Sequence, residues 1–310
     1  MMTSIEGVAA YEPPEVVSSG SCLAELGAGK QAGLYERFYG FSQVRRAPQA
    51  TIADLMYAAA AGLGELHGRE DQVRYVVHAA TLQPSAPYPR SPVHEVCRAL
   101  GLDRATAFAL GQHACASGLL ALDLCGKLLA ADRDPAGLAL ILVGEKTFSP
   151  VTQVIPHSAI TGEGTAAVLV GLAGERDRML GYAARTYGEF DTAPFWAPEL
   201  AAKFQRVYAP ALAEVIMAAV SGAGLTIGDI ALILPHNVNR MSWHQVAEAI
   251  GLPRERILLS SQPSLGHCFG ADSFINYKAA CQGGLLRPGD CYIMSAAGLG
   301  ATFAAMVFRH

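Results

Sequence analysis

Residues 111–125 read Gly-Gln-His-Ala-Cys-Ala-Ser-Gly-Leu-Leu-Ala-Leu-Asp-Leu-Cys, which places a thiol at a turn that opens directly into an apolar helix. Leucines recur after the turn at helical spacing, and this predicts a helix from about 114 to 131 that is anchored in a core. A helix N-terminus carries unpaired N–H groups and a partial positive charge, which favour the thiolate form of a cysteine. Cys115 is therefore a candidate nucleophile, and the competing interpretation is an inert thiol that only packs.

The composition limits the class of protein. The 310 residues are 51% hydrophobic and 16% charged and include 32 glycines, which is typical of a heavily buried α/β enzyme. A net charge of −4 gives no electrostatic basis for binding nucleic acid. The N-terminal residues lack a basic segment followed by an apolar one, so we expect no signal peptide. The longest apolar runs are broken by Gly, Lys, Asp or Glu before they reach transmembrane length, so we expect no membrane segment. Seven cysteines without paired spacing indicate free thiols, and we expect a cytoplasmic protein.

Short apolar runs alternate with longer helical patterns along the chain, which is typical of α/β architecture. The strands predicted in this way cover 73–78, 138–143, 165–170, 230–235 and 291–295. Similar turn residues precede the strands of the first and second halves, so an internal duplication is possible, although any α/β protein shares such cues. The segment 182–204, richer in aromatic residues and proline, is expected to link the halves and to cover a substrate tunnel.

Two histidines lie at the kind of position where α/β sheets carry catalytic groups. His236 follows the strand 230–235 and precedes a helical pattern, and His267 lies in a turn between glycines. A cysteine with two histidines is suited to acyl-thioester chemistry, because the imidazoles stabilise the thiolate and then donate hydrogen bonds to a carbonyl oxygen. A single histidine after a strand is more often structural, so neither position decides the function alone.

Other polar residues carry weaker signals. His113 lies two residues before Cys115, at a spacing that usually points side chains apart, and we interpret it, with His78 and His157, as structural. A zinc site made of Cys115, His236, His267 and Cys268 lacks any short-range ligand pair, so we predict no metal site.

Five segments, taken in chain order, resemble β-ketoacyl-acyl carrier protein synthase III-like enzymes of the thiolase superfamily. They are the Cys115-Ala-Ser-Gly118 turn, Thr161-Gly-Glu-Gly-Thr-Ala-Ala167, Pro235-His236-Asn-Val-Asn239, the Gly266-His267 segment, and Gly283-Gly-Leu-Leu-Arg-Pro-Gly-Asp290 with the Gly298-Leu-Gly300 loop. The resemblance covers nearly the whole chain. It implies a thiolase-like α/β fold of duplicated βαβαβαββ halves, 1–172 and 173–310, in a five-layer αβαβα arrangement, and a homodimer.

The resemblance also implies roles for individual residues. Cys115 would take the acyl group as a thioester, with His236 as the base or hydrogen-bond donor at the acceptor carbonyl and His267 as the third catalytic residue. The backbone N–H groups of Cys115 and of the loop at Leu299 and Gly300 would form the oxyanion hole. No cofactor is expected, because the substrates are carried as phosphopantetheine or coenzyme A thioesters.

This sequence departs from the family pattern in three places. The family has Asn where this chain has His267, which is compatible with condensation and also with a loss of decarboxylation. Asp272 follows it and would either orient His267 or cap the next helix, and Asn239 is a further possible supporting residue. In the segment 35–41 the expected Trp is absent and Phe38 replaces a basic residue, so a coenzyme A nucleotide would lose a stacking partner and an ionic contact, which favours carrier-protein thioesters. Five arginines could supply positive charges for docking an acidic carrier protein: Arg45, Arg46, Arg240, Arg254 and Arg256. The alternative interpretation is that they belong to an ordinary solvated surface.

Two functions follow from these observations. The first is a decarboxylative Claisen condensation between an acyl group on Cys115 and a malonyl-carrier protein thioester, in fatty-acid, polyketide or other secondary-metabolite synthesis. The alternative is an acyltransferase that moves the Cys115 acyl group to an alcohol or amine without decarboxylation. A non-catalytic partner subunit is disfavoured because the cysteine and histidines are present, and an unrelated Cys-His hydrolase is the remaining interpretation.

Overall fold

A nine-stranded mixed β-sheet forms the frame of the computed structural model, which describes residues 2–82 and 89–310. The strands follow one another across the sheet in the order β11-β12-β13-β10-β1-β9-β6-β4-β5. Their bounds are β1 Ser4–Tyr11, β4 Val73–Ala79, β5 Thr106–Leu110, β6 Leu138–Val143, β9 Thr165–Gly171, β10 Arg178–Thr186, β11 Ile230–Pro235, β12 Cys291–Gly298 and β13 Thr302–Arg309. The strands β6 and β9 are buried along their full length, as expected of central strands covered on both faces.

The sheet consists of two halves with the same pattern of strand pairing. In the first half β4 runs parallel to β6, and β6, β9 and β1 then pair antiparallel. In the second half β11 runs parallel to β12, and β12, β13 and β10 pair antiparallel in the same sequence. Even the edge strand β5, parallel to β4, has a counterpart in an isolated parallel bridge between Ile257 and Ile233. The halves join where β1 meets β10 at one residue pair, Ser4 and Arg178.

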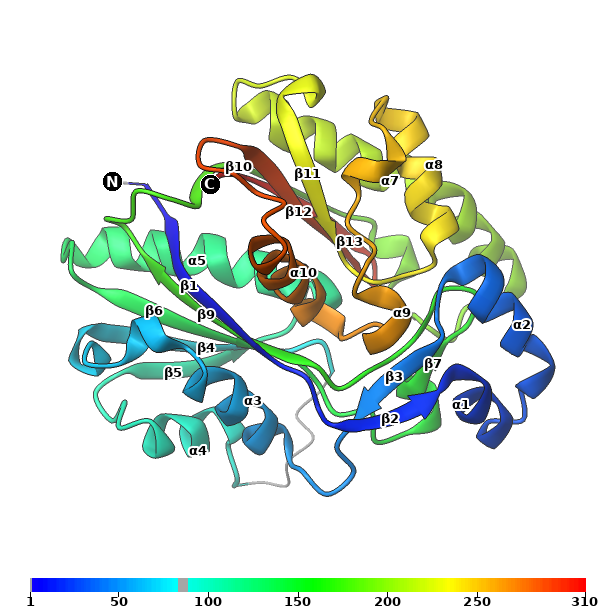
Figure 1. Cartoon of the computed structure of the whole chain (residues 1–310), viewed down its shortest axis with the longest axis horizontal. Helices are drawn as coiled ribbons and strands as arrows, with labels where there is room; N and C mark the ends of the chain where they lie inside the picture. The colour runs from blue at the N-terminus through cyan, green and yellow to red at the C-terminus, as the bar shows by residue number, and fades with distance from the viewer. Residues whose placement is uncertain (1, 83–88) are drawn as a thin grey trace.

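Helices complete five layers (Figure 1). The helices that matter here are α3 Ile52–Ala61, α4 Pro92–Ala99, α5 Ser117–Asp132, α7 Pro198–Gly222, α8 Arg240–Ile250 and α10 Asp272–Gln282. The pair α3 and α4 covers the outer face of the first half, and α7 and α8 cover the outer face of the second. Between the two halves lie α5 and α10, each in contact with strands of both. The duplicated, five-layer thiolase-like fold expected from the resemblance is confirmed.

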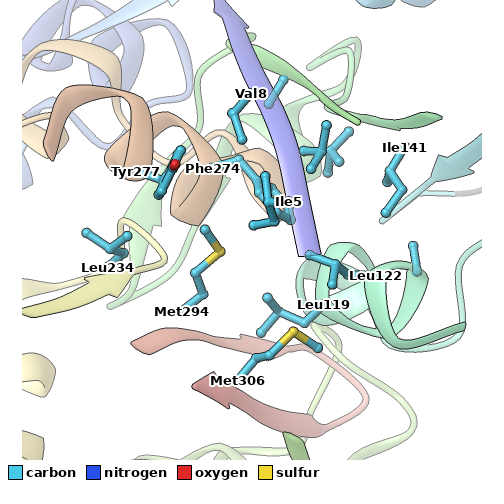
Figure 2. Packing of buried hydrophobic residues seen from close by; sticks show 14 of the residues in the cluster. Ile5, Val8, Leu119, Leu122, Ile141, Leu234, Phe274, Tyr277, Met294 and Met306 are labelled. Carbon is cyan, nitrogen blue, oxygen red and sulfur yellow. The ribbon is translucent and has the colours of Figure 1, made fainter. Parts of the chain in front are cut away.

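The middle layer holds a continuous hydrophobic core (Figure 2). Leu119 and Leu122 of α5 and Phe274 of α10 point into it, against Ile5 of β1 and Met306 of β13. Burying side chains of this size contributes about 1.5–3 kcal/mol each relative to exposure. The core therefore holds the N-termini of α5 and α10 in fixed positions against each other, and the turns before both helices are in contact.

Most sequence-based element predictions agree with the structure, and two need correction. The segment 182–204 is not a simple linker: its first residues belong to β10, and α7 begins at Pro198. The halves are joined instead by the turn between β9 and β10.

The second correction concerns apolar runs. The stretch Ala114–Asp132 is long and apolar enough to cross a membrane by length and composition, contrary to the expectation. It is the helix α5 with its preceding turn, and 61% of its most apolar window is buried between the two halves of the sheet.

Two small ribbons and four short helices complete the described chain. They are β2 Glu15–Ser18 with β3 Gln43–Arg46, β7 Val154–Ile155 with β8 Ala159–Ile160, and the helices α1 Ser19–Glu25, α2 Ala32–Leu34, α6 Pro150–Gln153 and α9 Gln262–Leu265.

Candidate active site

Cys115 lies in a single 3-10 turn, Ala114–Ala116, immediately before α5. The preceding Ala114 has a φ of 46°, in the left-handed region that non-glycine residues seldom adopt, and this turns the chain sharply before the thiol. The side chain is 5% exposed, and it lines a cavity. The predicted helix and the predicted position of the thiol at its start are both confirmed.

His267 reaches Cys115 from the second half of the chain. Its Nε2 atom lies 3.3 Å from Cys115 Sγ, and both side chains are buried. The backbone of His267 is held on both sides, because its N–H donates to the Ile160 carbonyl at 2.9 Å and its carbonyl accepts from the N–H of Gly162 at 2.9 Å. Gly266 is required before it: φ is 73°, and a Cβ there would lie 2.6 Å from the Val44 side chain.

Asp272, the first residue of α10, fixes the orientation of His267. Its Oδ2 atom lies 2.5 Å from His267 Nδ1 and also accepts from the N–H of Asn237, while Oδ1 accepts from the N–H of Cys268 at 2.7 Å. These groups precede α10 or belong to another segment, so Asp272 orients His267 and does not cap the helix. Burial alone would lower the pKa of His267, but the negative charges of Asp272 and Cys115 outweigh it and raise that pKa to about 10.

The three residues therefore form a continuous chain of hydrogen bonds. With both ring nitrogens protonated, His267 donates from Nδ1 to the carboxylate and from Nε2 to the sulfur. A thiolate paired with an imidazolium is the reactive form of a catalytic cysteine.

His236 has a different protonation state. It follows β11, as predicted, and its Nδ1 atom lies 3.3 Å from the carbonyl oxygen of Ser295, which can only accept a hydrogen bond. Burial and the positive charge of His267 lower the pKa of His236 to about 3, so the ring is neutral with its proton on Nδ1. Its Nε2 atom is then an acceptor, and the ring centroid lies 6.1 Å from that of His267.

A largely apolar cavity of about 600 Å³ connects these groups. Cys115, His236 and His267 all line it, and Trp196 and Phe204 form part of its wall. Pro194 and Trp196 belong to the segment expected to cover a tunnel, so that part of the expectation agrees with the structure. The volume suits a substrate of ordinary small-molecule size bound next to the thiol.

Known proteins resemble this chain in sequence and in structure. Residues 220–310 match the family model of the 3-oxoacyl-[acyl-carrier-protein] synthase III C-terminal region. A β-ketoacyl-[acyl-carrier-protein] synthase III of Lactobacillus delbrueckii subsp. bulgaricus is 28% identical over 289 residues, which are 87% of this chain and 88% of the relative. The solved structure of the acyltransferase ChlB3 superimposes with a TM-score of 0.85 at 22% identity, covering 100% of this chain and 98% of that one. The 3-oxoacyl-[acyl-carrier-protein] synthase III of Aquifex aeolicus superimposes with a TM-score of 0.81 at 20% identity, over 99% and 100% of the two chains.

These similarities agree with the order of the segments and with the duplicated fold. The chain is therefore similar in sequence to β-ketoacyl-[acyl-carrier-protein] synthase III proteins and shares their fold.

The loop expected to form the oxyanion hole lies against the nucleophile turn. Gly298, the last residue of β12, is so close to that turn that a Cβ would lie 1.9 Å from the carbonyl oxygen of His113. Gly298 and Leu299 line the cavity, whereas Gly300, with a φ of 127°, is outside its lining. The roles of the N–H groups at Cys115, Leu299 and Gly300 remain predictions.

The other residues singled out from the sequence have structural contacts. Asn239 caps α8, accepting from the N–H of Met241 at 2.9 Å, and donates to the His157 carbonyl, although it also borders the cavity. Among the candidate docking arginines, Arg240 donates to the carbonyl groups of Phe38 and Arg37, and Arg254 is exposed. Within 2–82 and 89–310 we find no cluster of three metal-ligating side chains.

Sequence reasoning missed Tyr208. This residue of α7 lines the cavity, and its hydroxyl lies 2.6 Å from His236 Nε2. The available signal was the spacing of Phe204 and Tyr208, which places two aromatic residues on one face of a helix. That pattern usually marks a core face, so nothing in it points to a hydroxyl beside a catalytic histidine.

Proposed function

We propose that this protein is a ketosynthase III-like enzyme that forms an acyl thioester on Cys115 and condenses it with a malonyl thioester carried by a carrier protein. The observation that carries the proposal is the buried chain Cys115–His267–Asp272 next to a largely apolar cavity. Two of the related proteins named above, from Lactobacillus delbrueckii and Aquifex aeolicus, are named as acyl-carrier-protein synthases III, which supports the same reaction class.

The first half-reaction uses the thiolate. Cys115 Sγ attacks the carbonyl carbon of the incoming acyl thioester, and the tetrahedral oxyanion is stabilised by backbone N–H groups near Cys115 and Leu299. The intermediate collapses with loss of the carrier thiolate, which takes the proton from His267 Nε2. The acyl group is then bonded to Cys115, and His267 regains a proton from solvent because Asp272 still favours its charged form.

The second half-reaction needs a donor at the malonyl thioester. Once Cys115 is acylated, its sulfur no longer holds a negative charge, so the N–H at His267 Nε2 is free to bond the malonyl thioester oxygen. Carbon dioxide leaves, its bonding electrons form the enolate, and the enolate carbon attacks the acyl thioester on Cys115. Collapse of this second intermediate releases the β-ketoacyl thioester and restores the Cys115 thiolate, so charge and atoms balance.

The decisive experiment measures carbon dioxide released from malonyl-carrier protein by enzyme that has first been acylated at Cys115. We expect release matched by a β-ketoacyl product, and neither acylation nor product with Cys115→Ala. Normal acylation of that variant would contradict the role of Cys115.

A second candidate function is acyl transfer from Cys115 to an alcohol or amine. The observation in its favour is that His236 Nε2 is a proton acceptor, which suits removal of a proton from such a nucleophile. In the same experiment, loss of the Cys115 acyl group to an added alcohol or amine without carbon dioxide would establish this function and exclude condensation.

We also propose that the protein works as a cytoplasmic homodimer that uses no cofactor. All seven cysteines are free thiols, which supports a reducing compartment. The strand β5 lies at the open edge of the sheet with a half-exposed face, a position suited to pairing with a second copy.

A further inference from the structure

Tyr208 lines the cavity, and neither half-reaction described above uses its hydroxyl. Its bond to His236 Nε2, at 2.6 Å, is short for a hydrogen bond between a hydroxyl and a ring nitrogen. The ring packs edge-on against Phe204 and Phe303, with centroids 5.7 Å away in each case. These contacts hold the ring in place, so the freedom that remains is rotation of the O–H about its C–O bond.

The direction of the hydrogen bond follows from the other end of His236. Because Nδ1 faces the Ser295 carbonyl, moving the proton to Nε2 would set two acceptors against each other. A doubly protonated ring is also unfavourable, because burial and the charge of His267 lower the pKa of His236 to about 3. His236 Nε2 therefore accepts, and Tyr208 donates. Desolvation, and next the charge of Cys115, raise the pKa of Tyr208 well above its usual value, so the hydroxyl keeps its proton.

With His236 as an acceptor, only one of the two histidines can donate a hydrogen bond to the malonyl thioester oxygen in the second half-reaction. His267 can donate from Nε2 after acylation, but His236 has no proton to offer at the atom that faces the cavity. Asn239, which also borders the cavity, accepts from the Met241 N–H with its side-chain oxygen and donates one amide hydrogen to the His157 carbonyl. Tyr208 lines the same cavity as Cys115 and carries a proton that can be turned away from His236.

We propose that Tyr208 is a catalytic residue that donates its hydroxyl hydrogen to the oxygen of the malonyl thioester as the enolate forms. This inference rests on the proposed function. In the resting enzyme the hydroxyl donates to a neutral imidazole, and in the transition state it donates to an oxygen with growing negative charge. Hydrogen bonds to charged acceptors are about twice as strong as neutral ones. The gain thus arises as the reaction proceeds, which is the condition for raising a rate and not merely for tighter binding.

No proton is transferred in this step. The bond between the carboxylate carbon and the α-carbon breaks, its electron pair enters the enolate, and Tyr208 keeps its hydrogen while sharing it with the enolate oxygen. Between turnovers the Tyr208 hydroxyl donates to His236 Nε2, which holds the hydroxyl beside the cavity. A change at His236 is therefore expected to affect the same half-reaction as a change at Tyr208.

The test compares Tyr208→Phe with the wild type in the two half-reactions separately. The phenylalanine ring keeps the contacts with Phe204 and Phe303, so folding, checked by thermal unfolding, should be retained. We expect Cys115 acylation, followed by mass spectrometry, within about twofold of wild type, and carbon dioxide release from malonyl-carrier protein to fall about 100-fold, a typical cost of losing one donor to an oxyanion. The control is Tyr187→Phe, which removes a hydroxyl bonded to Glu214 from a ring that also packs on Phe303, and it should leave both steps unchanged.

Equal carbon dioxide release by Tyr208→Phe and wild type would overturn the proposal. An equal loss in both half-reactions would also overturn it, since that result indicates a general effect on the site. If the wild type releases no carbon dioxide, the proposed condensation fails instead. Tyr208 is then judged on acyl transfer to an added alcohol, where an unchanged rate in Tyr208→Phe overturns the role of its hydroxyl.

Discussion

Two buried histidines 6.1 Å apart carry opposite protonation states because their neighbours differ. His267 faces Asp272 and the sulfur of Cys115, which favour its charged form, whereas His236 faces a carbonyl, a hydroxyl and the positive charge of His267. Burial disfavours charge at both positions, and only at His267 do the adjacent anions overcome it. The pair thus provides one donor and one acceptor within a single cavity.

Replacing the carboxylate of Asp272 by an amide should therefore test whether His267 must be charged or only held in position. In Asp272→Asn the anion next to Nδ1 is lost, burial then dominates the pKa of His267, and the ring becomes neutral at pH 7. We expect Cys115 acylation, measured as single-turnover acyl-enzyme formation, to slow about 100-fold. The control Asp123→Asn removes a partly buried carboxylate paired with Lys127 on α5 and should not change the rate. An Asp272→Asn enzyme acylated at the wild-type rate would show that the His267 charge is not needed.

The depressed pKa of His236 also predicts how stability depends on pH. The ordinary value is 6.5 and the folded value is about 3, so on acidification the unfolded chain takes up this proton first. Stability should fall as the pH decreases from 6.5 toward 3, by about 1.4 kcal/mol per pH unit from this group. Urea unfolding at pH 7, 6 and 5 should show a steeper decline for wild type than for His236→Asn, whose amide can still donate to the Ser295 carbonyl. Parallel curves would contradict a neutral, buried His236.

At the scale of elements, the end of β12 and the turn after it pack so closely against the turn that carries Cys115 that no side chain fits between the two backbones. The turn before α5 follows the edge strand β5 of the first half, and it is in contact with β12 and β13 of the second half. Gly298 is the point of closest approach. The absence of a side chain at this position is what allows backbone N–H groups of one half to approach the nucleophile of the other.

Adding one methyl group should test this fit. In Gly298→Ala the Cβ would lie 1.9 Å from the His113 carbonyl oxygen, so the two turns must separate. We expect Cys115 acylation to fall at least 10-fold, with a loss of stability of about 1–3 kcal/mol from strain in a close-packed region. Gly222→Ala, in α7 with open space around it, is the matched control and should be neutral or stabilising by up to about 1 kcal/mol. The prediction fails if both variants behave alike.

At the scale of the whole molecule, the active site exists because two halves of similar topology face each other. Cys115 comes from the first half, His236 and His267 from the second, and neither half holds a complete site. The first half ends in an uncovered edge at β5, whose residues are all exposed or half-buried. Long uncovered edges favour pairing with another strand, which is the physical basis for the proposed homodimer.

A charge on that edge should prevent pairing without unfolding the protein. Ala109 is exposed in the single chain, so Ala109→Glu is expected to keep the fold and disrupt association through β5. Light scattering after gel filtration should give about twice 32.6 kDa for wild type and about 32.6 kDa for the variant. A wild-type monomer, or a variant that stays dimeric, would exclude β5 as the interface.

The sequence by itself determined several of the elements and the order of the chemical groups. The apolar runs at 138–143 and 230–235 coincide with β6 and β11, His236 directly follows the second run, and Cys115 lies where the predicted helix starts. These features are local: a buried strand must be apolar along its length, and a nucleophile at a helix start is visible in a dozen residues.

The tertiary structure alone decided how those groups work. From the sequence, Asp272 could either orient His267 or cap the next helix, because sequence spacing does not show where a carboxylate points. In the fold the carboxylate contacts His267 Nδ1. Tyr208 is 28 residues from His236 in the chain, and a tyrosine on an aromatic helix face usually packs, so its contact depended on how α7 lies over the second half of the sheet. Protonation follows from burial and neighbouring charge, and both are set by residues that are distant in sequence and brought together only by folding.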